Sequence, residues 1–538
     1  MDSLEKRKSN LKKKIFGLAK NNYNKILIAV LVIAFLVRFW VFLKTKDQAI
    51  WWDAADYLAT AKRWAGINPN LIDMWYYRRG FFWPLFSMFF FLFRLGETEI
   101  RFSIVLFSTG IVAVSYFLIK EMFSKKLALL TCVGLTFSWI FLFFSGRPLT
   151  NLPATFFLLI AILFFWKGYI LKGNKKNFYF FGLFFALACL TRMQYLMFSI
   201  PLLVLMVLKE KLRFFTNKKI WISIGIFLLI FMPQIIIHWQ HFGNPLLDLS
   251  TYYLGISGSE SGEVGVKLVK ISDLFVYFKN LPYILDGNQQ GYSSLFSLSP
   301  IYLLFLGGFF GFFYDMFLGL DKIFKNKKIQ KKFFIFIWII STFMFLGYIA
   351  PHLEQRYMMQ TLPFLFLIAV YPLTKLGDYV HSKFKVDRKV ILFTSILILV
   401  LLLIPNLKFG NSLIEGKKTS YYEVKQAGLW IKEHSNPEDI IVSASLPQNT
   451  YYSERSTYPF RLAYRRDLPI GNETDFEAFV EFKKPRYLIL SIFEQNPDWT
   501  FQYPEKHPGL LVPVQAYQQG EQAVLVIYEF NYSNVSSI

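Results

Sequence analysis

The sequence predicts an all-α polytopic membrane protein that ends in an extracytoplasmic α/β domain. Hydrophobic residues make up 54% of the 538 positions and charged residues only 18%, whereas a soluble globular chain is about 25% charged. Apolar runs of nearly bilayer length recur up to about residue 404. Beyond that point the pattern changes to short amphipathic and alternating segments, as in a small α/β domain. Disordered, collagen-like and small disulfide-rich classes are excluded.

Eleven apolar runs are predicted to span the membrane as helices. Lysines and arginines collect between them, and more than half of the 59 lie in six short segments at alternate ends of the runs. This pattern places the N-terminus in the cytoplasm and the C-terminus outside. It also explains the net charge of +23 without a nucleic-acid partner. The runs are 26–43, 101–119, 127–144, 150–166, 178–191, 195–208, 220–237, 298–318, 333–350, 358–373 and 390–404; the basic segments are 1–25, 120–126, 167–176, 209–219, 322–332 and 375–389.

Three parts of the chain follow from this pattern. A basic cytoplasmic N-terminus covers residues 1–25, and a transmembrane domain with two long outer loops covers 26–404. The outer loops are 44–100 and 238–297. The extracytoplasmic α/β domain is predicted at 405–538.

Shorter elements are predicted in the first loop and in the tail. The stretch 50–65 is predicted as a helix, and the apolar Phe81–Phe93 is too short to span, so we expect an interfacial or re-entrant helix there. Tail helices are predicted at Ser420–His434 and Thr474–Phe482, and tail strands at Asp439–Ala444, Arg486–Ser491, Leu510–Tyr517 and Ala523–Phe530.

The first outer loop concentrates ionisable residues, which are costly beside a membrane span unless they pair or function. In a helix over 50–65, Asp53, Asp56, Tyr57 and Lys62 lie on or near one side. These acids are candidates for catalysis. The alternative is an interfacial helix whose acids face water or pair with Lys62 or Arg63.

Trp51 and Trp52 precede the first of these acids, Asp53. Indole rings favour the membrane interface. We expect them to raise the pKa of the Asp53 carboxyl by desolvation, a property that suits a general base.

Four arginines are candidates for binding phosphate, because the guanidinium fork matches phosphate oxygens in pairs. Arg78 and Arg79 precede an apolar helix, where ordinary headgroup anchoring is the alternative. Arg147 and Arg192 lie at the outer ends of apolar runs, against the positive-inside bias. Each of these two is expected to meet an anionic partner, either a protein carboxylate or a phosphate.

The turn between two later runs holds His352, Glu354 and Arg356. These side chains serve either a substrate site or the ends of two helices. His-x-Glu is a weak metal signature. The sequence contains no phosphate-binding loop and no dinucleotide fingerprint, so an activated substrate already in the membrane is the natural source of energy.

The first-loop residues resemble a family signature. Asp53, Ala55, Tyr57 and Ala61 match the Asp-Glu-Ala-x-Tyr-x-x-x-Ala motif of GT-C-fold glycosyltransferases that use polyprenyl-phosphate sugars. These include the protein O-mannosyltransferases and the lipid A aminoarabinose transferases. Ala54 stands where the family usually has Glu. A different acceptor and a loss of activity both stay open.

Further segments resemble the family in the same order along residues 26–375. "GETEIRFSIV" contains Arg101 at a family arginine, "SGRPLTNLPATFF" contains Asn151 where an acid is common, and "ALACLTRMQ" contains Arg192 at a family lysine. "FFWPLFSMFFFLF", "HFGNPL" and "EQRYMMQTLPFLF" resemble three more family motifs.

The resemblance implies a GT-C-like plasma-membrane glycosyltransferase. It would move a hexosyl or pentosyl group from a polyprenyl-phosphate donor to an extracytoplasmic hydroxyl of a lipid, glycan or protein, with inversion. It implies Asp53 as base, with Asp56 as candidate second acid. Arg192, Arg78, Arg79 and Arg356 are expected to bind the donor phosphate, with Tyr57, Arg147, Asn151, His352 and Glu354 as further substrate-site candidates. No cofactor is certain, and a divalent metal ion stays open.

Two alternatives from other classes remain at this point. A lipid-linked glycan flippase or transporter would use the same arginines to pass a charged lipid. A noncatalytic membrane scaffold would only bind it.

Overall fold

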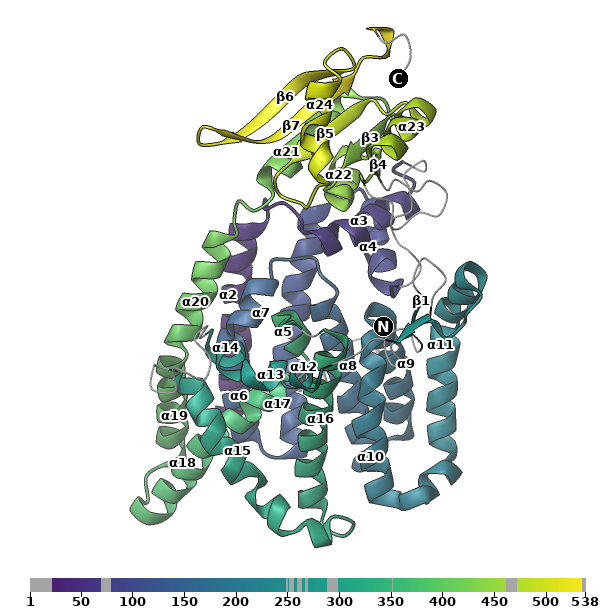
Figure 1. The fold of residues 1–538 in the computed structure, drawn as a ribbon. Helices are drawn as coiled ribbons and strands as arrows, with labels where there is room; N and C mark the ends of the chain where they lie inside the picture. Colours follow the sequence, from purple (N-terminus) through teal and green to yellow (C-terminus); the bar gives the residue numbers. More distant parts are fainter. Residues whose placement is uncertain are drawn as a thin grey trace, which may run out of the picture.

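The computed structural model describes residues 22–68, 79–247, 250, 256–258, 264–266, 270–287, 299–350, 352–460 and 472–534. Figure 1 shows a bundle of long helices that carries a small domain with a β-sheet at one end. The predicted fold class, a helical membrane part with a C-terminal α/β domain, is confirmed.

Six helical segments among the described residues are long and apolar enough to cross a membrane. A further pair, α19 (Arg388–Leu402) and α20 (Ile404–Gly416), is bent by 42° and would make a seventh span if it crosses as one unit. Pro405 lies at the start of α20, where its missing N–H is tolerated. The six are α2 (Asn22–Thr45), α5 (Glu97–Met122), α8 (Asn151–Phe165) with η1 (Trp166–Ile170), α11 (Lys218–Phe242), α15 (Pro300–Leu318) and α16 (Lys327–Ile349).

The other predicted runs form shorter or interrupted helices. The run 127–144 breaks at Ser138, whose backbone is extended between two helices. The total of eleven spans stays a prediction. The shorter helices are α6 (Lys125–Phe137), α7 (Trp139–Phe144), α9 (Lys175–Thr191), η2 (Met193–Phe198), α10 (Ser199–Glu210), η3 (Lys211–Thr216), η6 (Leu320–Lys322), η7 (Gln355–Met358), α17 (Leu362–Ala369) and α18 (Tyr371–Phe384).

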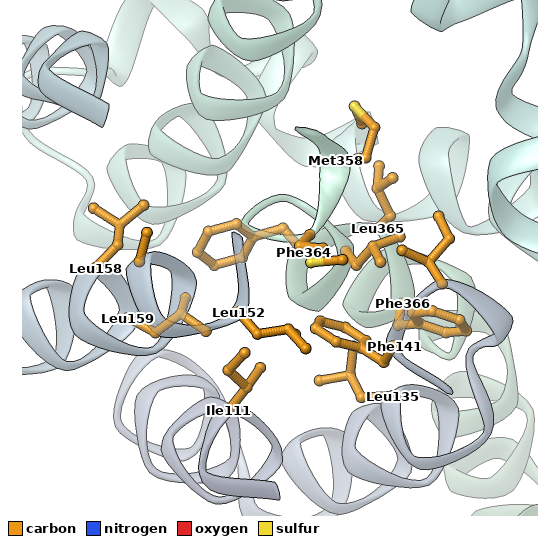
Figure 2. Packing of buried hydrophobic residues seen from close by; sticks show 14 of the residues in the cluster. Ile111, Leu135, Phe141, Leu152, Leu158, Leu159, Met358, Phe364, Leu365 and Phe366 are labelled. Carbon is orange, nitrogen blue, oxygen red and sulfur yellow. The ribbon is translucent and has the colours of Figure 1, made fainter. Parts of the chain in front are cut away.

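Helix α17 packs at the centre of the bundle. Figure 2 shows its side chains among those of α5, α6, α7 and α8. The contact between α17 and α6 depends on a glycine, since a Cβ at Gly134 would lie 2.5 Å from the ring of Phe366. Met358 of the preceding turn, η7, belongs to the same buried cluster, so this packing positions η7.

The first outer loop contains both predicted helices. Helix α3 (Trp52–Trp64) lies between the bundle and the C-terminal domain, and α4 (Phe82–Leu92) packs beside it (Figure 1). The second outer loop contains elements that the sequence does not predict. They are β1 (Ile256–Gly258) and β2 (Val264–Val266), which pair antiparallel, and the short helices α12 (Ile271–Leu274), α13 (Val276–Lys279) and α14 (Leu281–Asp286).

The C-terminal domain is built on a mixed five-stranded sheet in the order β4-β3-β5-β7-β6. Strand β3 pairs parallel with β4 and β5, whereas β7 pairs antiparallel with β5 and β6. The sheet buries a separate apolar cluster on each face. The strands are β3 (Ile440–Ser443), β4 (Ser456–Tyr458), β5 (Tyr487–Ser491), β6 (Leu511–Gln519) and β7 (Gln522–Phe530).

Both tail helices and all four tail strands predicted from the sequence are present. The sequence missed α22 and β4, because "LPQNTYYSERSTY" lacks a regular apolar period. The helices of this domain are α21 (Tyr422–His434), α22 (Leu446–Ser453), α23 (Glu473–Lys483), η8 (Asp498–Phe501), α24 (Tyr503–Lys506) and η9 (Tyr532–Asn534).

Candidate active site

Asp53 lies in the first turn of α3 and pairs with two arginines from distant parts of the chain. One carboxylate oxygen accepts a hydrogen bond from Nη1 of Arg356 at 2.8 Å, and the other lies 3.4 Å from Nη2 of Arg79. The partial positive charge of a helix N-terminus also favours a carboxylate at this position. Asp53 is therefore held as an anion at the meeting point of α3, η7 and the start of α4.

Asp56 lies one turn farther along α3 and shares Arg79 with Asp53. Its Oδ2 atom lies 3.2 Å from Nη1 of Arg79. The two acids differ in exposure, since the Asp53 side chain is 31% exposed and that of Asp56 only 6%. Asp53 is thus the more accessible of the two to a reactant.

The expected rise in the pKa of Asp53 is wrong. Burial does raise the pKa of this carboxyl, but the charges of Arg356 and Arg79 and the hydrogen bond from Arg356 outweigh it and hold the pKa below its ordinary value. Arg192 lowers it further. The sequence pattern revealed the neighbouring indoles but not the guanidinium groups that fold against the same carboxylate.

Arg192 ends α9 and faces the same cavity as Asp53. This cavity of about 160 Å³ is also lined by Arg79, Arg356 and Tyr57. The Arg192 guanidinium donates a hydrogen bond to Thr150 at 3.3 Å and lies over the ring of Tyr357 at 4.8 Å.

No carboxylate of the described residues lies within salt-bridge distance of Arg192, unlike Arg79 and Arg356. Its charge is therefore available to an anionic ligand. We name the hollow that it lines with Asp53, Arg79 and Arg356 the cationic cavity.

A second cavity of about 520 Å³ opens on the other side of Asp53. Asp53 and Arg356 line both cavities. Seven of its fifteen lining residues are aromatic and come from α3, α7, α14 and the start of the C-terminal domain: Trp51, Trp52, Trp139, Phe143, Phe144, Tyr283 and Tyr421. We name it the aromatic cavity.

Arg147 does not line the cationic cavity, and in the described structure it has no carboxylate partner. Its guanidinium lies instead between the rings of Trp51 and Phe143, 4.0 Å and 3.9 Å from their centres, and donates to the Phe143 carbonyl. The expected anionic partner is replaced by aromatic faces, which attract cations through their quadrupole. Arg147 supports the wall of the aromatic cavity from behind.

Asn151 contacts the site through the backbone. Its Nδ2 donates to the carbonyl oxygen of Arg356 at 3.1 Å. A carboxylate at this position would lack that donor. Asn151 therefore positions η7 and does not line either cavity.

The turn before η7 has one side chain in the site, Glu354, and one in the solvent, His352. Glu354 lines the aromatic cavity and accepts from Nε of Arg356 at 3.1 Å. His352 is 73% exposed, with Nε2 3.8 Å from Glu354. Within the described ranges, no three His, Cys, Asp or Glu side chains gather as metal ligands. Arg78 lies outside the described residues.

Several lining residues were not predicted. Trp139 enters the aromatic cavity because the helix breaks at Ser138, and a continuous apolar run hides such a break. Thr150 and Tyr357 hold Arg192 from two other segments. The sequence signal for Tyr357 was its place beside Arg356; Thr150 and Trp139 had none.

The comparisons agree with this architecture. Residues 80–237 match the family model described as dolichyl-phosphate-mannose-protein mannosyltransferase. No curated protein matches the chain. Among solved structures, apo ArnT from Cupriavidus metallidurans aligns with a TM-score of 0.64 at 12% identity, covering 93% of this chain and 97% of ArnT.

Two ligand-bound structures are also similar. ArnT from the same organism, bound to undecaprenyl phosphate, has a TM-score of 0.59 at 11% identity and covers 95% of this chain and 98% of ArnT. The Archaeoglobus fulgidus oligosaccharyltransferase AglB, in complex with an inhibitory peptide and a dolichol-phosphate, has a TM-score of 0.56 at 14% identity, covering 94% and 74%. The resemblance predicted from the sequence motifs is confirmed, and the chain is a multi-pass membrane protein with the GT-C fold.

Proposed function

We propose that this protein is a membrane glycosyltransferase that moves one sugar from a polyprenyl-phosphate donor to the hydroxyl group of an acceptor. Asp53 would be the base that takes the hydroxyl proton. One observation carries the proposal: among the described residues, Asp53 is the one carboxylate that lines both a cavity with three arginines and a cavity with several aromatic rings. A donor with an anionic leaving group and an acceptor with a carbohydrate or lipid surface require such a pair of hollows.

The cationic cavity suits the donor phosphate. Arg79, Arg192 and Arg356 approach it from α4, α9 and η7, and guanidinium groups bind phosphate oxygens bidentately. The leaving phosphate gains negative charge during the reaction, so these preorganised donors stabilise the transition state more than the ground state. ArnT and AglB carry polyprenyl phosphates in two of the similar structures.

The aromatic cavity suits the acceptor. Trp51, Trp52 and Tyr283 line this cavity together with Asp53. A sugar ring or an acyl surface that packs against these aromatic side chains would bring the acceptor hydroxyl to Asp53. The acceptor belongs to a lipid, a glycan or a protein.

The chemical step is a direct displacement. The acceptor oxygen forms a bond to the anomeric carbon while the bond from that carbon to the phosphate oxygen breaks. The electron pair leaves on the phosphate, and the hydroxyl proton passes to Asp53. A single displacement inverts the anomeric configuration, whereas retention needs a second carboxylate as nucleophile about 5 Å from the acid. Asp56 is buried against Arg79, which favours the inverting route.

Donor binding would also strengthen the base. In the described structure Arg356 and Arg79 bind Asp53 and lower its pKa, and a weaker base accepts a proton less readily. A donor phosphate competes for the same two guanidinium groups. As they turn toward the phosphate, the pKa of Asp53 rises, so the base becomes effective only when the donor is present.

The proposal also includes an orientation. Three of the predicted basic segments, 209–219, 322–332 and 375–389, lie at the end of the bundle away from the α/β domain (Figure 1). From the positive-inside rule we infer that the site and the α/β domain face the outside of the plasma membrane.

Reconstitution tests the proposal against its two alternatives. Purified protein in liposomes is given polyprenyl phosphates that carry one radiolabelled hexose or pentose at a time, together with a membrane extract as acceptor. A glycosyltransferase transfers the label to an acceptor and releases polyprenyl phosphate. Movement of intact donor between leaflets would identify a flippase, and binding without either event would identify a scaffold.

A further inference from the structure

The largest of the cavities described here, about 710 Å³, lies far from Asp53, at the end of the bundle opposite the α/β domain. Its wall comes from the start of α6, the start of α16, the length of α18 and the start of α19. Six of its lining side chains are cationic: Lys125, Lys126, Lys328, Lys332, Lys375 and Arg388. We name it the basal cavity.

Carboxylates balance only part of this charge. Asp378 lies 3.3 Å from Lys126, and Asp315 lies 2.7 Å from Lys328 and 3.3 Å from Lys332. The remaining three cations, Lys125, Lys375 and Arg388, have no carboxylate within salt-bridge distance among the described residues. The cavity therefore has an excess of positive charge.

The N-termini of three helices add to this excess of positive charge. Helices α6, α16 and α19 all begin at the basal cavity, α19 directly after its capping residue Asp387, and none has an acidic residue in its first turn. Each has lysine or arginine there instead, although the N-terminus of a helix already carries partial positive charge and normally favours anions. This arrangement is unfavourable in an empty cavity and favourable around an anion. The positive-inside rule explains why cations lie on this face, but not why they surround one hollow.

The wall also has an apolar part, which bears on the ligand. Phe312, Leu127 and Ile391 line the cavity together with the lysines. Lys332 is buried, with its side chain only 3% exposed, and its ammonium group bonds to the Phe312 carbonyl as well as to Asp315. A ligand that fits has a charged end and an apolar body.

We propose that the basal cavity binds the phosphate group of an anionic lipid from the leaflet opposite the catalytic site. Basic pockets between transmembrane helices are suited to such headgroups. Phosphate oxygens would contact Lys375, Arg388 and Lys125, while the apolar body lies against Phe312 and Ile391. The lipid would link α6, α18 and α19 at this end of the bundle.

Lipid retention tests this site without an activity assay. The purified protein is incubated with equal amounts of dioleoylphosphatidylglycerol and dioleoylphosphatidylcholine, and bound lipid is counted by native mass spectrometry. We expect selective retention of phosphatidylglycerol, and about tenfold weaker retention in the double variant Lys375→Gln, Arg388→Gln.

The matched control is Lys322→Gln, Lys325→Gln. It removes the same charge near the same end of the bundle, from exposed residues that do not line the cavity, and it should retain the lipid like the unchanged protein. Equal loss in both double variants would reduce the effect to general surface attraction and overturn the site. Displacement of the lipid by millimolar inorganic phosphate would overturn the lipid assignment in favour of a soluble phosphate. An unchanged thermal unfolding temperature in detergent verifies that each variant is folded.

Discussion

Asp53 is the residue on which the proposed chemistry depends. In Asp53→Asn the proton acceptor is lost while the side-chain volume is kept, so the transfer rate should fall by about 10²- to 10⁴-fold. The same change removes the anion that occupies Arg356 and Arg79, so undecaprenyl phosphate should bind at least as tightly as before. The rate is measured as label transferred from the donor, and binding by titration in detergent. Loss of lipid binding in parallel with the rate would argue for a structural role instead.

Arg192 should bind the donor phosphate through charge-assisted hydrogen bonds, because its guanidinium has no carboxylate partner in the described structure. Charge-assisted hydrogen bonds contribute about 1.5–3 kcal/mol, so Arg192→Gln should weaken undecaprenyl phosphate binding by roughly ten- to a hundredfold. Binding of undecaprenol, which lacks the phosphate, should not change. Arg213→Gln is the control, since Arg213 is exposed and lines neither cavity. An equal effect on both lipids would contradict the assignment.

The pH dependence of kcat/KM should show how far Arg356 lowers the pKa of Asp53. Because that pKa lies below its ordinary value, Asp53 stays ionised down to acidic pH, and the acid limb of kcat/KM in the free enzyme lies below about pH 4. Arg356→Gln removes one lowering charge, so the pKa rises and the acid limb moves to higher pH. An unshifted limb in this variant would show that another group controls it.

Helix α3 connects the catalytic carboxylate to the C-terminal domain. Asp53 lies at its first turn, and near its last turn Lys62 bonds to Glu454 at 2.8 Å, just after α22. Both side chains are largely buried, 12% and 13% exposed. Lys62 also lies over the ring of Tyr451. The domain thus holds the helix that presents the base.

This contact predicts a stability effect. Glu454→Gln leaves Lys62 buried without its anion, and breaking a buried pair costs about 3 kcal/mol or more. Thermal unfolding in detergent should show a lower Tm. The double change Lys62→Met, Glu454→Leu removes both charges and should recover most of the loss. If the double variant were no more stable than the single one, packing and not charge would explain the contact.

The two charged cavities lie at opposite ends of the helical bundle, and the membrane orientation decides which side of the membrane each one faces. Cysteine labelling tests this orientation. The native Cys132 and Cys189 are both buried and should not react with the label. In intact cells, a membrane-impermeant maleimide should label Gln518→Cys in the exposed β6 strand and leave Lys322→Cys unlabelled. Both should react after permeabilisation. Labelling of Lys322→Cys alone in intact cells would reverse the proposed orientation.

The class of fold and the local character of the site can be predicted from the amino-acid sequence. Apolar runs and basic segments follow from the cost of exposing polar groups to lipid, which acts on each segment separately. The α3 helix, the tail strands and the candidacy of Asp53 and Arg192 come from such local patterns.

Which charged side chains meet depends on the packing of the chain. Arg79 and Arg356 reach Asp53 across 26 and 303 positions of the chain, and this reversed the expected direction of its pKa shift. It also gave Arg147 two aromatic rings in place of an anion, and it gathered lysines from the starts of α6 and α16 and Arg388 from the start of α19 into one cavity. Electrostatic energies depend on distance and burial, and residues far apart in sequence acquire both only when the chain is packed.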